Sequence, residues 1–188
     1  MHPSSRPNSV KILPNLLTIA RILAAPVLFW LVWVHRYTPV IVLFIAIGIT
    51  DVADGFIARR FRASSRLGAY LDPVADKLLL SGMFVTLLLA RLIAPWLAAI
   101  VLGRDVLILA VGAIFYLRRT RRDFPPSIWG KLSTFAQILF VCFRIGELDG
   151  IRVHAMATML AWAVAALVLV SLADYARRLA SPVPASRA

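Results

Sequence analysis

Hydrophobic residues along the chain form six long runs that are separated by short polar segments. The runs cover Leu13 to Val34, Pro39 to Ala58, Leu67 to Leu92, Pro95 to Leu117, Ile128 to Ile145 and Ile151 to Tyr175. Each is close to the roughly 20 apolar residues that a helix needs to cross a bilayer. The pattern predicts an all-α integral membrane protein with six transmembrane helices. No linker divides the chain, so we expect one membrane domain over residues 1–188, with mobile tails at 1–10 and 181–188.

The composition favours a membrane protein over a soluble one. Apolar residues make up 61% of the 188 residues, against roughly 45–50% in soluble domains. The net charge of +12 is of the kind that attracts nucleic acid or anionic membranes. Because the basic residues sit between apolar runs and form no continuous stripe, we expect membrane lipids as partners and no nucleic acid. Cys142 is the single cysteine, which excludes a Cys-based metal site within one chain.

The basic residues also predict how the chain is oriented. If the six runs cross the membrane in turn, 14 Lys and Arg residues fall in the segments and run ends on one side and 4 on the other, and three more, Arg21, Lys77 and Arg104, lie deeper inside runs. Basic residues are enriched in cytoplasmic loops. We therefore expect a multi-pass protein, of a bacterial cytoplasmic membrane, with both termini in the cytoplasm.

Five of the nine acidic residues lie inside the apolar runs and away from their ends, where charge is unfavourable. They are Asp51, Asp54, Asp72, Asp76 and Asp105. One Asp at the centre of a spanning helix costs about 2.5–3.5 kcal/mol on insertion scales, so such residues are candidates for function. The first two are spaced i, i+3 and the next two i, i+4, so each pair shares one helix face. Both pairs lie roughly 6–14 Å below the expected cytoplasmic surface, where the basic segment 59–66 lies, and can meet across two antiparallel helices.

Four converging carboxylates need counter-charge, and their oxygens suit a hard cation. The spacing thus predicts a site for Mg²⁺ or Mn²⁺, with two ions per site able to clamp a phosphoryl group. The alternative is that the acids pair with Arg21, Lys77 and Arg104 to hold the helices together. That interpretation suits Asp105 best, because it follows Arg104 directly.

One segment resembles the signature of a known enzyme family. The residues Asp51-Val-Ala-Asp54-Gly55-Phe-Ile-Ala58-Arg59, followed by Gly68, Asp72 and Asp76, satisfy every fixed position of D-x2-D-G-x2-A-R-x8-G-x3-D-x3-D. This is the pattern of the CDP-alcohol phosphatidyltransferases. The resemblance extends to Pro14-Asn15-Leu16-Leu17-Thr18 with Arg21, and to Trp129-Gly130-Lys131.

The resemblance implies a six-helix membrane enzyme, usually a homodimer, that moves a phosphatidyl group from CDP-diacylglycerol to an alcohol and releases CMP. It implies that Asp51, Asp54 and Asp72 hold the metal ions, and that Asp76 both helps to bind metal and deprotonates the acceptor hydroxyl. The residues implied in binding the CDP moiety are Asp54, Gly55, Ala58, Arg59 and Gly68. The active site would face the cytoplasm, where a soluble acceptor can meet a lipid substrate.

The acceptor is less well defined by the sequence. A phosphate-bearing acceptor needs cationic contacts, and we expect them from Lys131, at the cytoplasmic mouth of its span, and from Arg104, which lies deeper. The length and Leu71-Asp72-Pro73-Val74-Ala75-Asp76-Lys77 resemble enzymes that make phosphatidylglycerophosphate from glycerol 3-phosphate. Gly103-Arg104-Asp105-Val106 resembles cardiolipin synthases of the same fold, which use phosphatidylglycerol. Inositol phosphate, serine and choline are further acceptors within the family.

Two readings without catalysis stay open from the residues alone. The carboxylates could form the coordination site of a divalent-cation transporter or channel. Against this, the acids cluster towards one face and no inverted repeat is visible. A degenerate family member acting as a scaffold is the other reading, and the four intact acids argue against it.

Overall fold

The computed structural model describes residues 9–61, 66–117 and 127–180, and within these ranges all regular structure is helical. The six helices in this part of the chain are α1 (Ser9–Trp33), α2 (Tyr37–Phe61), α3 (Arg66–Leu89), α4 (Pro95–Leu117), α5 (Ile128–Leu148) and α6 (His154–Ala180). For 9–19, 51–61, 66–76, 112, 115–117 and 180 only the backbone is described. The expected tails, apart from residues 9 and 10, lie outside the described residues.

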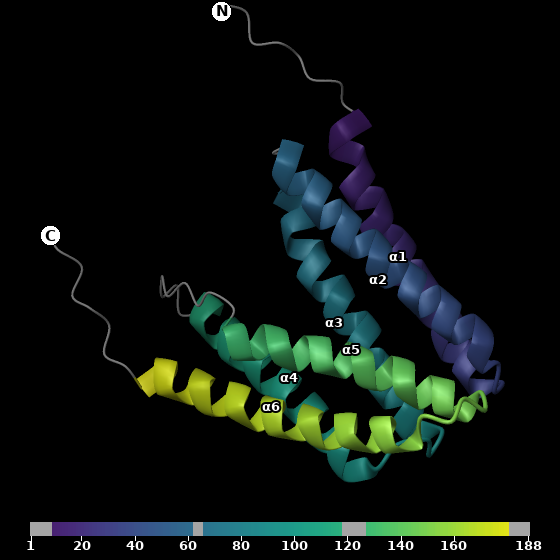
Figure 1. The fold of residues 1–188 in the computed structure, drawn as a ribbon. Coiled ribbons are helices and arrows are strands. Elements are labelled where there is room, and N and C mark those ends of the chain that lie inside the picture. Colours follow the sequence, from purple (N-terminus) through teal and green to yellow (C-terminus); the bar gives the residue numbers. More distant parts are fainter. Residues whose placement is uncertain (1–8, 62–65, 118–126, 181–188) are drawn as a thin grey trace, which may run out of the picture. The chain divides into compact units, whose positions relative to one another are not determined.

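Each predicted apolar run corresponds to one of these helices, with boundaries that differ by a few residues (Figure 1). Ile128–Leu148 and His154–Leu179 are long and apolar enough to cross a membrane. Shorter apolar stretches occur in the described parts of three other helices, at Ala20–Trp33, Tyr37–Thr50 and Lys77–Leu89. The all-α prediction is confirmed for the described residues, whereas a crossing by all six helices and the side of the termini stay predictions.

The chain divides into two compact units, and the first contains α1, α2 and α3 together with residues 148–150. In this unit α1 packs against both α2 and α3. The buried α1 residues Ala25, Leu28 and Val32 recur at i, i+3 and i+7, which places them on one stripe of the helix. Gly82 of α3 lies directly against the ring of Phe29, so the absent side chain lets α1 and α3 approach closely.

Three helices end in the same hydrogen-bonded cap. After α1, α3 and α5 the residues in the left-handed conformation are His35 (φ 56°), Arg91 (φ 56°) and Gly150 (φ 91°). In each cap the next N–H reaches back five residues: Arg36 N to Leu31 O, Leu92 N to Leu87 O and Ile151 N to Gly146 O, at 2.8–3.0 Å. This is the Schellman arrangement, which satisfies carbonyls at the helix end. It reverses the chain within a few residues.

The second unit contains α4, α6 and nearly all of α5. Here α4 packs against α6, and Trp96 stacks on Trp162 with ring centroids 5.0 Å apart. The buried side of α5 carries apolar residues and also two polar ones, Ser133 and Gln137. The amide of Gln137 donates to the Ser133 hydroxyl at 3.1 Å, so these two buried groups partner each other.

Candidate active site

The eight signature residues lie on two consecutive helices of the first unit. Those on α2 are Asp51, Asp54, Gly55, Ala58 and Arg59; those on α3 are Gly68, Asp72 and Asp76. The α2 acids precede the helix end at Phe61 by ten and seven residues, and the α3 acids follow its start at Arg66 by six and ten. At 1.5 Å per residue, both pairs lie about 9–15 Å from the ends joined by residues 62–65. The backbone thus keeps them at matching depth, and their side chains lie outside the described residues.

The donor chemistry of this segment suits a divalent cation. The four acids offer carboxylate oxygens only, the ligand type that Mg²⁺ and Mn²⁺ prefer. On regular helices, spacings of i, i+3 and i, i+4 keep both members of each pair on one face. The residues present therefore fit a metal-binding role, and the ligand assignment itself stays a prediction.

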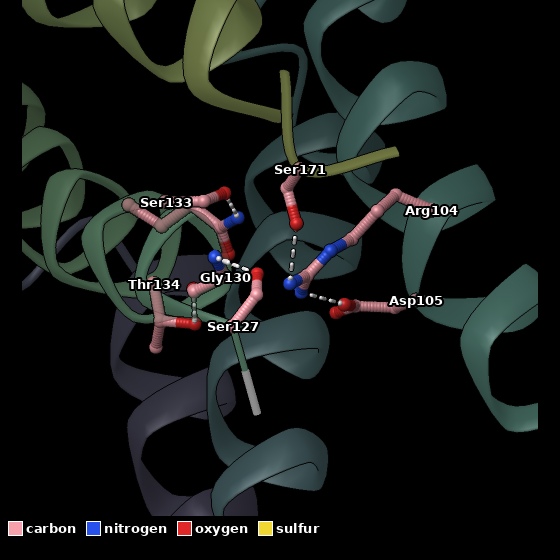
Figure 2. A network of polar contacts seen from close by, with 8 residues as sticks. Arg104, Asp105, Ser127, Gly130, Ser133, Thr134 and Ser171 are labelled. Carbon is pink, nitrogen blue, oxygen red and sulfur yellow. Dashed lines mark hydrogen bonds and ion pairs between the residues drawn. The ribbon is translucent and has the colours of Figure 1, made fainter. Parts of the chain in front are cut away.

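A second set of polar residues meets in the other unit, around Arg104 of α4 (Figure 2). Arg104 Nη1 donates to Asp105 Oδ1 at 2.9 Å, and Arg104 Nη2 donates to Ser171 Oγ of α6 at 3.3 Å. The side chains of Arg104 and Asp105 are only 7% and 6% exposed. The sequence-based expectation that Asp105 pairs with its neighbour is confirmed.

The guanidinium of Arg104 also reaches the first turn of α5. A Cβ atom placed on Gly130 would lie 3.2 Å from Arg104 Nη2 and 3.7 Å from Ser171 Oγ. Because Gly130 has no side chain, Arg104 can lie against the helix at this point. Arg104 lies far into α4 from the end that precedes α5, yet its side chain extends to the residue before Lys131.

Ser127 caps the start of α5. Its hydroxyl accepts from the Gly130 N–H at 3.0 Å, and its carbonyl accepts from the Lys131 N–H at 3.1 Å. A serine immediately before the first helical residue commonly makes these bonds. The positive end of the helix dipole therefore points to the same region as Arg104. Lys131 itself is exposed, so this turn carries an exposed ammonium group, a helix N-terminus and a buried guanidinium.

The Nε atom of this guanidinium is a further possible donor to a ligand. Within the described part of the chain, Arg104 Nε is buried and makes no hydrogen bond. A buried N–H without an acceptor is unfavourable, so a ligand or water oxygen placed there would stabilise the site. The arrangement is suited to bind an anion that carries several oxygen atoms.

Sequence reasoning identified Arg104 and Lys131 as site candidates but missed the residues that surround them. Ser127 follows the rule for helix caps and could have been found from its place before an apolar run. Ser171 stands alone among apolar residues of α6, and a lone polar residue in such a run is a signal of a buried contact. The spacing in the sequence gave no indication that Ser171 meets Arg104, because 67 residues separate them.

Comparison with known proteins identifies the family. The sequence model of the CDP-alcohol phosphatidyltransferases matches residues 11–174, which include α2, α3, Arg104 and Lys131. The chain belongs to the CDP-alcohol phosphatidyltransferase family. It is an enzyme of this type, from a membrane-associated family of phospholipid biosynthesis whose members generally depend on divalent metal ions.

The relatives of this phosphatidyltransferase differ in the reaction that their names give. A CDP-diacylglycerol–glycerol-3-phosphate 3-phosphatidyltransferase of Aquifex aeolicus is 31% identical over 86% of the chain and 92% of its own length. A CMP-forming cardiolipin synthase of Rattus norvegicus is 42% identical over 69% of the chain. A cardiolipin synthase and hydrolase fusion protein of Schizosaccharomyces pombe is 35% identical over 77% of the chain. The chain spans about half of the rat protein (48%) and about a quarter of the fusion protein (27%).

Proposed function

We propose that this phosphatidyltransferase moves a phosphatidyl group from CDP-diacylglycerol to the primary hydroxyl of glycerol 3-phosphate and releases CMP. The observation that carries the assignment of a phosphate-bearing acceptor is the meeting of Arg104 with the start of α5 at Gly130, the residue before the exposed Lys131 (Figure 2). An anionic phosphate would there receive directed N–H donors together with net positive charge. The similar length of the Aquifex aeolicus relative also favours glycerol 3-phosphate.

In the reaction, the acids of α2 and α3 have separate tasks. Asp51, Asp54 and Asp72, with Asp76, would hold Mg²⁺ or Mn²⁺, two ions per site. Bound metal would polarise the pyrophosphate and stabilise the departing CMP. Asp76 would take the proton of the acceptor hydroxyl, whose oxygen attacks the lipid-bearing phosphorus in line with the leaving group.

The CDP moiety would lie against the same part of α2 and α3. Gly55 and Ala58 leave one side of α2 free of large side chains, which allows a nucleotide to approach the backbone. Arg59 would pair with the diphosphate, and Gly68 would give room at the start of α3. Asp54 would contact both the metal and the nucleotide.

Phosphatidylglycerol is the second candidate acceptor, and a specific observation favours it. The identity to the rat cardiolipin synthase, 42%, exceeds that to the Aquifex aeolicus relative, 31%. Both acceptors carry a phosphate next to a glycerol hydroxyl, so the same cationic contacts suit either.

The family likeness also supports the membrane arrangement proposed here. The six helices would cross the membrane with both termini and the active site on the cytoplasmic side, most simply in a bacterial cytoplasmic membrane and as a homodimer. One side of the membrane would carry 14 Lys and Arg residues and the other side 4. Basic residues are enriched in cytoplasmic loops, so this difference supports the orientation.

The test uses full-length protein in detergent with CDP-diacylglycerol and glycerol 3-phosphate. CMP should be released with Mg²⁺ or Mn²⁺ present and not with chelator. Asp54→Asn should lower metal affinity and activity together. CMP release that persists in chelator would contradict the metal role. Absence of release with glycerol 3-phosphate would contradict the proposed acceptor.

A further inference from the structure

We propose that Ser171 of α6 and Asp105 of α4 are positioning residues for Arg104. Together they would hold its guanidinium against the first turn of α5, in the orientation that binds the acceptor phosphate. This rests on the proposed function in one respect, namely that Arg104 contacts the acceptor. The contacts that carry the proposal join two helices to the same guanidinium (Figure 2).

The pairing of Arg104 with Asp105 restricts the guanidinium more than an ordinary ion pair would. Consecutive residues of a helix point about 100° apart, so they do not normally face each other. Here the two side chains extend from α4 in the same direction, and Arg104 Nη1 reaches Asp105 Oδ1 at 2.9 Å (Figure 2). A long side chain held in that conformation loses freedom that free Arg residues retain.

Ser171 fixes the other end of the guanidinium. Its hydroxyl accepts from Nη2 at 3.3 Å, and this serine is itself buried with 3% exposure. Nη1 and Nη2 each donate once to the protein, and the buried Nε has no acceptor among the described residues. The two partners thus fix the plane of the guanidinium and the directions in which its remaining N–H groups could meet a bound anion.

The net charge of the proposed acceptor site explains why Lys131 would act together with Arg104. The Arg104 guanidinium is already neutralised by the Asp105 carboxylate, so the buried pair adds little net charge to the site. Arg104 would contribute direction through its planar donors, while the exposed Lys131 would contribute attraction. Loss of a positioning residue should then weaken acceptor binding and spare the binding of CDP-diacylglycerol.

The experiment measures KM for glycerol 3-phosphate, KM for CDP-diacylglycerol and kcat in full-length protein. Ser171→Ala should raise the acceptor KM between about twofold and tenfold, the range that one net hydrogen bond gives. The KM for CDP-diacylglycerol should stay unchanged. Ser171→Thr keeps the hydroxyl and should keep the acceptor KM. The matched control is Ser133→Ala, because Ser133 is equally buried and hydrogen-bonded but partners Gln137 instead of Arg104.

A double-mutant cycle separates positioning from general damage. In an Arg104→Gln background, Ser171→Ala should raise the acceptor KM no further, since the group that Ser171 positions is gone. A rise that persists in that background, or one that Ser133→Ala reproduces, would overturn the role of Ser171. If Arg104→Gln raises the acceptor KM and Ser171→Ala does not, the positioning proposal alone fails. If Arg104→Gln has no effect on this KM, the Arg104 contact of the proposed function fails too.

Asp105→Asn gives a second measurement that does not depend on Ser171. This change keeps the shape and one oxygen but removes the charge that holds the guanidinium, so the acceptor KM should rise. If Asp105 acted only by cancelling charge, its removal would make the site more positive and the acceptor KM would fall. A fall would therefore overturn its positioning role.

Discussion

Gly82 provides a sharp test of how the helices of the first unit pack. A Cβ atom at this position would overlap the Phe29 ring, with Cζ as the nearest atom and Cε1 and Cε2 each 3.0 Å away. Gly82→Ala must therefore push the ring or separate α1 from α3. Inserting a methyl group into a filled interface costs about 1–3 kcal/mol.

The control for this substitution is Gly48→Ala on α2. A Cβ at Gly48 would meet nothing within 4 Å, so only the higher helix propensity of alanine acts there. That effect stabilises by up to about 1 kcal/mol and is present in both variants. The difference in unfolding free energy between the two variants, about 1–3 kcal/mol, isolates the overlap with Phe29.

The assay is denaturant-induced unfolding of the purified protein in detergent, with thermal melting as a second measure. Gly82→Ala should unfold more easily than Gly48→Ala. In a Phe29→Ala background, where the ring is absent, Gly82→Ala should lose its penalty. Equal stability of Gly82→Ala and Gly48→Ala in the natural background would refute the close approach of α1 and α3.

Three further predictions concern the caps and the active site. Arg91→Gly should stabilise the protein by about 1 kcal/mol, because Arg91 has a left-handed backbone (φ 56°) that glycine adopts without strain. Thermal melting checks this, and a lower melting temperature for the variant would contradict it. Asp76→Asn should abolish turnover yet leave CDP-diacylglycerol binding largely intact, and near-normal CMP release by this variant would exclude Asp76 as the base. Lys131→Ala should raise KM for a phosphate-bearing acceptor more than KM for CDP-diacylglycerol, and equal effects on both substrates would remove Lys131 from the acceptor site.

The helices were predictable because each is a long apolar run, and the boundaries show where that rule stops. The run that predicted α4 begins at Pro95, and the helix begins there too, because proline fits the first helical position. The α5 run was expected to end at Ile145, but the helix continues through Glu147 to Leu148. Ile151 was assigned to the next span, whereas its N–H closes the cap of α5 and α6 starts at His154. Polar residues at a helix end hide the boundary from a hydropathy pattern.

The two halves of the candidate site differ in how far the sequence could define them. The acids of α2 and α3 follow a local spacing, so their grouping on two helices was predictable. The surroundings of Arg104 depend on contacts between distant segments, including Ser171 and Gly130. Periodicity within one helix carries no information on such contacts. The left-handed residues His35 and Arg91 were also hidden, since only a glycine would have marked those caps.

The most direct test of the central claim is to identify the lipid made by the purified protein. CDP-diacylglycerol and Mg²⁺ or Mn²⁺ would be supplied with glycerol 3-phosphate in one reaction and with phosphatidylglycerol in a second, and both CMP and the lipid product would be measured. The account predicts CMP and phosphatidylglycerophosphate in the first reaction and neither CMP nor cardiolipin in the second. Cardiolipin in the second reaction, with no product in the first, would contradict the proposed acceptor and make phosphatidylglycerol the substrate.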